Sequence, residues 1–524
     1  MQSFATEGVS ADRDEARVVV AAPNRLAAEA GARVGADGGS AVDAALAAML
    51  VTAVSEPGIV SIGGGAFVTV APPGEAPVTV DGYVEMPGRG LPPSAFRQGT
   101  RELHSATYAG GTSMTIGHGS VGTPGLLRAF EEAHRRYGHV PWRVVVEPAI
   151  EISRSGFPFG AAVHYYLGTL GQELLAHDAD ARAAVFDDRG VIRGLGETIV
   201  VPHLADFLER VADEGSDAIF RGDVARALVE DMAANGGVIT QADLDEYRTV
   251  VRPSSTVQVA DWTIATNPPP AIGGPVLAAM LILLDGHPAD KWSDEDLLRW
   301  VAVQRAVLRH RAAELDVATD RAHAGQALLD SVLAGGQKWL GVAPSTAHVS
   351  VVDAEGFACS VTASSGYGAG VSIPGTGVWL NNCLGEHELN RGGLHSLAPG
   401  ERLASNMAPS VARRPDGAVL AIGSPGADRI TTALAQVLAS FAHGGYDLQQ
   451  AIDRPRVHLS RGPDGSEVLH QEDDVVLPPT IDLPIKKYPP RAMFMGGVAA
   501  ALREADGTLV GAADPRRSGA VALG

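Results

Sequence analysis

Pro344-Ser345-Thr346-Ala347-His348-Val349-Ser350-Val351-Val352-Asp353 is the stretch from which the rest of the chain can be interpreted. A small polar cluster that contains Thr346 runs directly into a β-rich stretch, without the charged residues of an ordinary surface linker. The pattern predicts a strand with a small nucleophilic side chain at its start.

The residues that follow predict a β-hairpin. Asp353 to Gly356 is turn chemistry, and Phe357 to Ser364 alternates with a period of two residues. Cys359, Val361 and Ala363 share one face of this second strand, while Ala358, Ser360, Thr362 and Ser364 share the other. If Val352 pairs with Phe357, Thr346 lies opposite Ala363 or, with a one-residue bulge, opposite Ser364. We therefore expect a second hydroxyl beside Thr346.

Residues 346–353, Thr-Ala-His-Val-Ser-Val-Val-Asp, resemble the Thr-Thr-His-x-Ser-Val-Val-Asp signature of the γ-glutamyltranspeptidases, which are N-terminal-nucleophile hydrolases. The resemblance implies a precursor that cuts its own Ser345–Thr346 bond into a large subunit, residues 1–345, and a small subunit, residues 346–524. It also implies one catalytic domain of the α/β (α+β) class, a four-layer αββα sandwich. A free α-amine has a pKa near about 8 and can act as general base, so Thr346 would supply both nucleophile and base.

Further segments match the family in the same order along the chain. Gly38 to Ala45 predicts a helix capped by Ser40, and Ser120 to Gly125 is followed by a predicted helix from Leu126 to Tyr137. Gly423 to Ile430 resembles the family's Gly-Ser-Pro-Gly-Gly-x-Arg-Ile segment, whose backbone amides form the oxyanion hole. The resemblance assigns these amides to Gly426 and Ala427, and Ala427 keeps the N–H that the role requires.

The segments that would recognise a γ-glutamyl group depart from the family. Asp81 to Pro87 occupies the place of the Asp-x-Arg-Glu-x-Ala-Pro segment, and we expect Val84 where its substrate-binding arginine should stand. Asn381 to Glu386 replaces the Asn-Asn-Gln-x-x-Asp turn, and Arg402 to Ser410 resembles the Leu-Ser-Ser-Met-x-Pro segment. From these matches the residues expected to contact substrate are Arg89, Asn382, Glu386, Ser405 and Asn406.

Composition narrows the classes of partner. The 524-residue chain is 45% hydrophobic with a formal net charge of −20, which argues against nucleic acid and anionic membrane surfaces. Its two cysteines, Cys359 and Cys383, predict neither a disulfide framework nor a zinc site, so no metal and no cofactor is expected. The N-terminal stretch lacks an apolar signal region, from which we expect a cytoplasmic protein.

The sequence therefore predicts a self-processing amidohydrolase for a small, non-γ-glutamyl acyl group, with an oxamate-like amide ranked first on size alone. The family that the chain resembles also includes cephalosporin acylases and a carbon–carbon hydrolase of alkylproline antibiotic pathways, which depart from γ-glutamyl chemistry. Three alternatives stay open: a true γ-glutamyltransferase or glutathione hydrolase, a carbon–carbon bond hydrolase of an alkylproline antibiotic pathway, and an unprocessed, non-catalytic relative. The partners expected are the amide substrate and the two fragments of one precursor, and a homodimer of processed heterodimers is left open.

Overall fold

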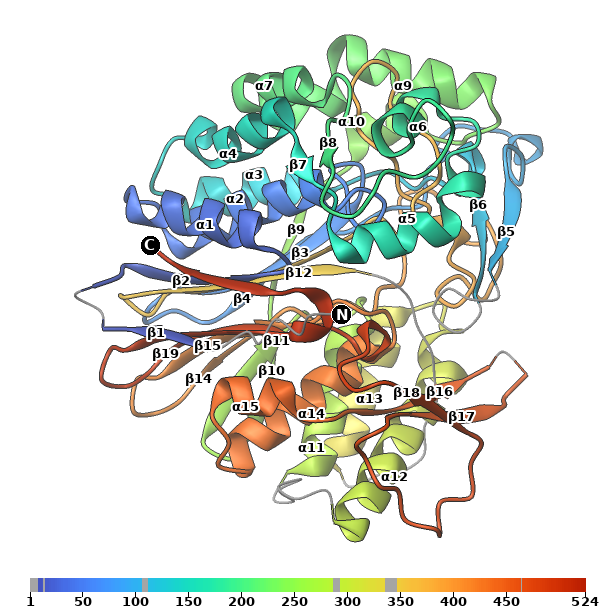
Figure 1. Cartoon of the computed structure of the whole chain (residues 1–524). Coiled ribbons are helices and arrows are strands. Elements are labelled where there is room, and N and C mark those ends of the chain that lie inside the picture. The colour runs from blue at the N-terminus through green and yellow to red at the C-terminus, as the bar shows by residue number, and fades with distance from the viewer. Residues whose placement is uncertain (1–7, 13–14, 106–111, 286–292, 335–345, 463) are drawn as a thin grey trace.

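Two seven-stranded antiparallel sheets lie face to face in the middle of the molecule (Figure 1). The computed structural model describes residues 8–12, 15–105, 112–285, 293–334, 346–462 and 464–524. The predicted tether, Gly335 to Ser345, lies outside the described residues, and with it one side of the predicted cleavage site.

The first sheet contains the strand that begins after Thr346. In spatial order it consists of β21 (Ala520–Leu523), β2 (Val18–Ala22), β12 (Ala347–Asp353), β13 (Ala358–Ser364), β3 (Gly65–Ala71), β4 (Val78–Gly82) and β9 (Val250–Pro253). The second sheet consists of β1 (Val9–Ala11), β20 (Leu509–Ala513), β19 (Ala499–Arg503), β15 (Val419–Gly423), β14 (Ser410–Arg413), β11 (Trp262–Thr266) and β10 (Ser255–Val259). Since β12 is third from one edge, Thr346 enters an interior strand.

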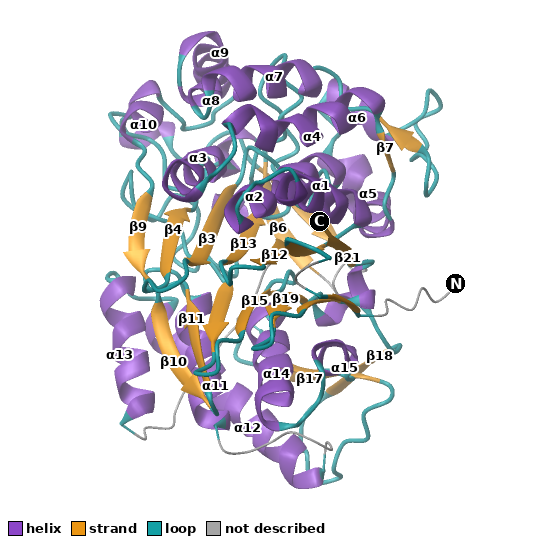
Figure 2. Cartoon of the chain, turned by 90° about the vertical axis from the view of Figure 1, so that its left-hand side faces the viewer, coloured by secondary structure: helices purple, strands orange, loops and turns teal. Residues whose placement is uncertain are grey.

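Helices cover the outer face of each sheet, so that Figure 2 shows helix, sheet, sheet and helix from top to bottom. The layer over the first sheet contains α1 (Arg25–Ala36), α2 (Ala41–Ser55), α3 (Leu126–Tyr137), α4 (Trp142–Ser155), α5 (Ala161–Leu174), α6 (Ala179–Val185), α7 (Leu204–Glu214), α8 (Asp217–Phe220), α9 (Gly222–Ala234) and α10 (Gln241–Glu246). The layer under the second sheet contains α11 (Gly273–Leu284), α12 (Asp294–His310), α13 (Arg321–Leu333), α14 (Arg429–His443) and α15 (Leu448–Asp453). The predicted four-layer αββα sandwich is confirmed.

Three small sheets lie outside the sandwich. They are formed by β5 (Arg101–Ser105) with β6 (Thr112–Ile116), by β7 (Phe157–Pro158) with β8 (Thr198–Ile199), and by β16 (Val457–Arg461), β17 (Glu467–Glu472) and β18 (Ile485–Tyr488). Among the described residues no helix is both long and apolar enough to span a bilayer.

Alternation along the strands separates two kinds of core. In β12, Val349 and Val351 pack toward the helices, whereas Val352 belongs to a cluster between the sheets. The helix layer comes very close, because α2 is buried along its whole length and a Cβ on Gly31 of α1 would lie 2.7 Å from the Ala44 carbonyl oxygen. Ser40 caps α2 in a capping box with Asp43, as predicted.

The hairpin forms, but its predicted register is wrong by one residue. Val352 pairs with Ala358 and Ala347 with Ala363, and the Asp353 N–H donates to the Phe357 carbonyl at 3.1 Å. The loop is therefore the three residues Ala354 to Gly356, closed by Gly356 at a φ of +82°. Continued by one residue, this register sets Thr346 opposite Ser364 with no bulge.

Candidate active site

Thr346 lies directly before β12 and is 2% exposed. Across the strand pair lies Ser364, the last residue of β13, whose Oγ accepts a hydrogen bond from the Gly366 N–H at 3.0 Å. The hairpin thus brings two hydroxyl side chains together at one end of an interior strand pair.

Below Thr346 the space between the sheets is polar and fully bonded. His348 bonds Thr362 Oγ1 through Nδ1 at 2.8 Å and Ser350 Oγ through Nε2 at 2.7 Å. Burial lowers the pKa of His348 to about 3, so the ring is neutral at ordinary pH. A Cβ on Gly423 would lie 2.2 Å from His348 Cε1, so glycine there allows β15 to approach β12.

The loop that follows β15 reaches Thr346. Pro425 and Thr346 line the same small pocket, and α14 begins at Arg429 immediately after the loop. Gly426 has a φ of +121° and Ala427 a φ of +69°, so both lie in the left-handed region that side chains disfavour. This backbone turns the Gly426 and Ala427 segment sharply between a strand end and a helix N-terminus, the kind of place where amides bind anions.

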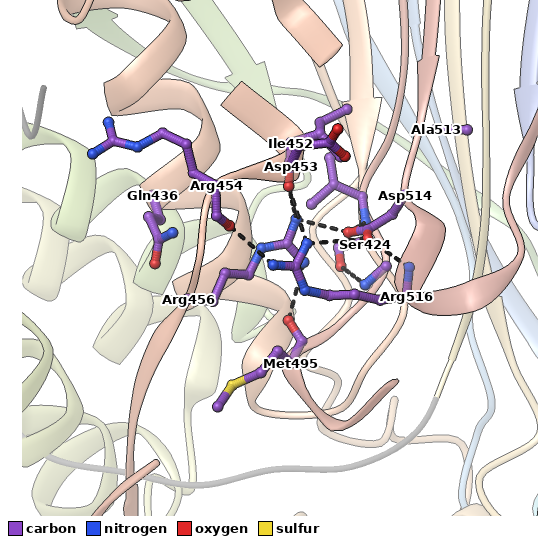
Figure 3. A network of polar contacts seen from close by, with 12 residues as sticks. Ser424, Gln436, Ile452, Asp453, Arg454, Arg456, Met495, Ala513, Asp514 and Arg516 are labelled. Carbon is purple, nitrogen blue, oxygen red and sulfur yellow. Dashed lines mark hydrogen bonds and ion pairs between the residues drawn. The ribbon is translucent and has the colours of Figure 1, made fainter. Parts of the chain in front are cut away.

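A network that we call the arginine frame, formed by Arg456, Glu472, Asp514 and Arg516, supports this loop. Arg456 pairs with Asp514 at 2.7 Å and donates to the Met495 carbonyl at 3.1 Å, while Arg516 donates to the Arg454 carbonyl at 2.9 Å (Figure 3). Burial acts to raise the pKa of Asp514, but the charges of Arg456 and Arg516 outweigh it and hold that pKa below its usual range. The frame is therefore charged and rigid.

The frame connects to the loop through the start of β19. Asp514 accepts the Val498 N–H at 2.9 Å, and Ser424 Oγ accepts the Gly497 N–H at 3.2 Å. The position of Pro425 beside Thr346 is thus determined by bonds that begin far along the chain.

A second set of polar side chains, the Glu386 cluster, is buried but poorly bonded. It consists of Tyr83, Cys383, Glu386 and Ser405, with apolar walls that include Phe67 and Met407, and the buried Asn406 follows Ser405 in the chain. Neither oxygen of Glu386 has a hydrogen-bond partner among the described residues, and the same holds for both polar atoms of the Asn406 amide. Buried polar groups are rarely left without partners unless a ligand or water supplies them.

Charge in the Glu386 cluster is strongly disfavoured. Burial, then the neighbouring carboxyl of Glu388, raises the pKa of Glu386 well above its usual range. Burial, then the charges of Cys383 and Glu386, raises the pKa of Tyr83. Burial therefore favours the neutral forms of Glu386 and Tyr83, and the cluster combines a carboxyl, a phenol, a thiol and a hydroxyl.

The cluster lies next to Ser364 by a short path. Ser364 bonds the Gly366 N–H, and a Cβ on Gly366 would lie only 3.0 Å from the Glu386 carboxyl carbon. Gly366 has a φ of +63°, so this position needs glycine both for its left-handed backbone and for its close contact with Glu386. The turn after β13 thereby brings the Glu386 cluster to the Thr346 end of the hairpin.

Three sequence expectations about substrate contacts need correction. Counted position by position, the family's arginine corresponds to Tyr83 rather than to Val84, which is buried in an apolar cluster. Arg89 pairs with Asp243 at 3.1 Å, Glu85 at 3.3 Å and Glu246 at 3.0 Å, so a substrate carboxylate would have to displace these partners.

Asn382 is also occupied by the fold. Its Oδ1 accepts the Tyr367 N–H at 2.6 Å and its Nδ2 donates to the Thr115 carbonyl at 3.2 Å. Ser405, in contrast, lies in the Glu386 cluster beside Tyr83, and both polar atoms of the neighbouring Asn406 amide lack partners among the described residues. Tyr83 and Cys383 were missed, although the alternative alignment of Asp81 to Pro87 would have pointed to Tyr83.

Among the part of the chain that the structure describes, no group of three or more histidine, cysteine, aspartate or glutamate side chains is arranged to hold a metal ion.

The layered fold, with a buried threonine at the start of an interior strand, is the fold of the N-terminal-nucleophile hydrolases. Residues 27–524 match the family model described as Gamma-glutamyltranspeptidase, and the chain belongs to that family. Its fold is similar to the crystal structure of cephalosporin acylase from Bacillus halodurans, with a TM-score of 0.75 and 22% identity, covering 99% of this chain and 97% of that one.

Two curated relatives extend over nearly the full length. The acylase ACY 1 proenzyme of Pseudomonas sp. (strain SE83) is 30% identical over 96% of this chain and 93% of its own. The glutathione hydrolase proenzyme of Escherichia coli (strain K12) is 28% identical over 95% of this chain and 90% of its own. Family and relatives make this chain a hydrolase of amide carbon–nitrogen bonds, with acyl transfer as the related activity.

Proposed function

We propose that the chain is a self-processing amidohydrolase that cuts its own Ser345–Thr346 bond and then hydrolyses a small, non-γ-glutamyl amide through an ester on Thr346. The support for the nucleophile is its place: buried, at the start of an interior strand, opposite Ser364 and in one pocket with Pro425. The proenzyme names of both relatives fit a chain that is made as a precursor.

The mechanism follows from groups that this geometry brings together. The α-amine freed by the cut takes the proton of the Thr346 hydroxyl, and the oxygen attacks the amide carbonyl. The N–H groups of Gly426 and Ala427 stabilise the oxyanion, and the proton passes to the leaving amine as the carbon–nitrogen bond breaks. Water then attacks the ester and releases the acid. Ser364 keeps the threonine hydroxyl or amine oriented.

The observation that favours a non-γ-glutamyl acyl group is the chemistry of the Glu386 cluster. Tyr83 stands where the family has a substrate-binding arginine, and the charge that acts on Glu386 is another carboxyl, Glu388. An α-carboxylate placed there would lose a bidentate charged partner, and each charged hydrogen bond contributes on the order of 1.5–3 kcal/mol.

The same cluster suits a small acyl group with hydrogen-bonding atoms. Glu386, whose neutral form burial favours, would gain its missing partner from such a group within the walls of Phe67 and Met407. An oxamate-like amide keeps its first rank on size, and other small polar acyl groups share this chemistry.

Intact mass spectrometry of the purified protein tests the first step. The expected products are fragments of 345 and 179 residues, the second beginning at Thr346, whereas Thr346→Ala should give one uncut chain. A single full-length chain in active enzyme would overturn the proposal.

Substrate assays test the second step. γ-Glutamyl-p-nitroanilide should be hydrolysed far more slowly than the best amide in a panel that includes oxamate and short acyl anilides. Adding glycylglycine separates transfer from hydrolysis, because a transferase would make an acylated dipeptide. Turnover of the γ-glutamyl compound at a rate ordinary for the family would favour the glutathione hydrolase alternative.

A further inference from the structure

The small pocket that Thr346 shares with Pro425 contains charged side chains that the mechanism above does not use. Its lining includes Pro23, Glu56, Thr346, Pro425, Gly497 and Arg517, and it shares none of the residues of the Glu386 cluster. We call it the Thr346 pocket. It draws together the ends of β2, α2 and β15 and the start of β19, and it faces the residue whose amine the cut would release.

Arg517 is brought to this pocket by the arginine frame. It follows Arg516, and the short helical turn η7 (Pro515–Arg517) keeps both near the Pro425 loop. A Cβ on Gly497 would lie 2.4 Å from Arg517 Cγ, so only glycine lets the arginine stem pass. Beyond it, Arg517 Nη2 lies 3.7 Å from where a Cβ on Gly426 would be. The guanidinium thus sits against the proposed oxyanion loop.

Glu56 lies on another wall of the pocket, at the C-terminal cap of α2, and is 8% exposed. Asn24 holds it, because Asn24 Nδ2 donates to Glu56 Oε1 at 3.0 Å while Asn24 Oδ1 caps α1 through the Ala27 N–H at 3.0 Å. Burial raises the pKa of Glu56, against an opposing effect of the Arg517 charge. The two side chains therefore influence each other across the pocket.

The other titratable groups that line the pocket are already committed. His348 is neutral and bonded on both ring nitrogens, and Asp514 is paired with Arg456 and Arg516. The remaining titratable side chains among the described lining residues are Glu56 and Arg517, which carry opposite charges on two walls of the pocket.

We propose that Glu56 and Arg517 are a pair of positioning residues with opposite charge that set how tightly the Thr346 α-amine holds its proton. The inference rests on the proposed function, since the amine exists only after the cut. Arg517 opposes protonation and so keeps the amine available as a base at neutral pH. Glu56 favours protonation and offers the amine hydrogens an acceptor, which orients its lone pair toward the threonine hydroxyl.

The proposal makes a prediction of sign that a structural role does not. Removing the positive charge should move the acidic limb of the kcat/KM profile to higher pH, and removing the negative charge should move it to lower pH. A charge within a few ångströms shifts the pKa of a neighbouring group by about 1 unit or more. We therefore expect the acidic limb to move by roughly 0.5–1 pH unit in each single neutral variant. The double neutral variant should return toward the wild-type profile.

The test compares Glu56→Gln, Arg517→Met, Arg517→Lys and the Glu56→Gln/Arg517→Met double variant on the processed full chain. Each variant is first checked for the 345- and 179-residue fragments, and its pH profile is then measured with the best amide substrate. Arg517→Lys keeps the charge and should keep the wild-type limb. Arg189→Gln is the matched control, because that arginine is 83% exposed and pairs with Asp187 outside the pocket.

The inference would be overturned if Glu56→Gln and Arg517→Met moved the acidic limb of the kcat/KM profile in the same direction, or if both moved it by less than about 0.2 pH unit. If Glu56→Gln does not mature, the comparison of Arg517→Met with Arg517→Lys still decides, since both keep Glu56. Failure of the proposed function looks different: the wild-type chain would stay uncut or would hydrolyse no amide.

Discussion

Replacing Glu386 by glutamine should stabilise the protein, and by an amount that depends on pH. Glu386 is 1% exposed, and neither of its oxygens has a hydrogen-bond partner among the described residues. The nearby Cys383 thiol acts on it, but a thiol is a weak donor. A glutamine of nearly the same shape removes the ionisable group and leaves the apolar contacts of the cluster in place.

The sign follows from linkage. The folded pKa of Glu386 is raised, so the unfolded chain releases this proton first, from about pH 4.3 upward. Between that value and the folded pKa, the unfolded state binds fewer protons, and the stability of the wild type falls by up to about 1.4 kcal/mol per pH unit. The advantage of the glutamine variant therefore grows with pH through this window and becomes constant above the folded pKa. Below the unfolded pKa the advantage vanishes.

Urea unfolding in the Thr346→Ala background measures this without interference from self-cleavage. Tryptophan fluorescence at pH 4, 5, 6 and 7 gives the midpoint difference between chains with and without the Glu386→Gln substitution at each pH. Glu295→Gln serves as control, since that carboxylate is 84% exposed and should give no such trend. A midpoint difference that is constant across this range, or a glutamine variant that is less stable at pH 7, would refute the reasoning.

The remaining predictions concern the nucleophile and its supports. Ser364→Ala should slow maturation or turnover by about 10–100-fold, measured by timed gels and kcat, and unchanged rates would mean that Ser364 orients neither group. Ala427→Gly keeps the backbone N–H and removes the strain of a left-handed alanine, about 1 kcal/mol, which offsets the similar entropic cost of glycine. The melting temperature and kcat should therefore change little, and a large loss of kcat would mean that the alanine methyl contacts the substrate. Thr362→Val removes the partner of His348 Nδ1 and should cost about 1–3 kcal/mol in urea unfolding. Because burial holds the pKa of folded His348 at about 3, this histidine is protonated in the unfolded chain before it is protonated in the folded protein as the pH falls. The titration of His348 therefore lowers stability between about pH 6 and pH 4, and His348→Asn should reduce that loss in urea unfolding.

Much of the fold could be predicted because its signals are local. The hairpin turn, the Ser40 capping box and the helix from Leu126 to Tyr137 depend on residues within one turn or one strand of each other. The register error has a local cause as well. Gly356 closes a three-residue loop in the left-handed conformation, which is a known hairpin type and was readable from its position.

The sequence could not show which of the candidate substrate-binding side chains are bonded within the fold, because their partners are distant in sequence. Arg89 meets Asp243, 154 residues away, and Asn382 meets the Thr115 carbonyl, 267 residues away. A pattern of residue types shows which side chains could bind a carboxylate or an amine. It does not show which of them the fold has already used.

That difference separates two kinds of buried polar group in this molecule. In the arginine frame each carboxylate is met by cationic side chains and backbone N–H groups, so its burial is compensated and its position is rigid. Glu386 and Asn406 are just as buried, yet the polar atoms of both side chains lack hydrogen-bond partners among the described residues. Burying a polar group without a partner costs free energy. A structural role would be served as well by apolar side chains of the same size. We therefore expect Glu386 and Asn406 to gain partners from a bound substrate, while the bonded frame keeps the Pro425 loop aligned beside Thr346.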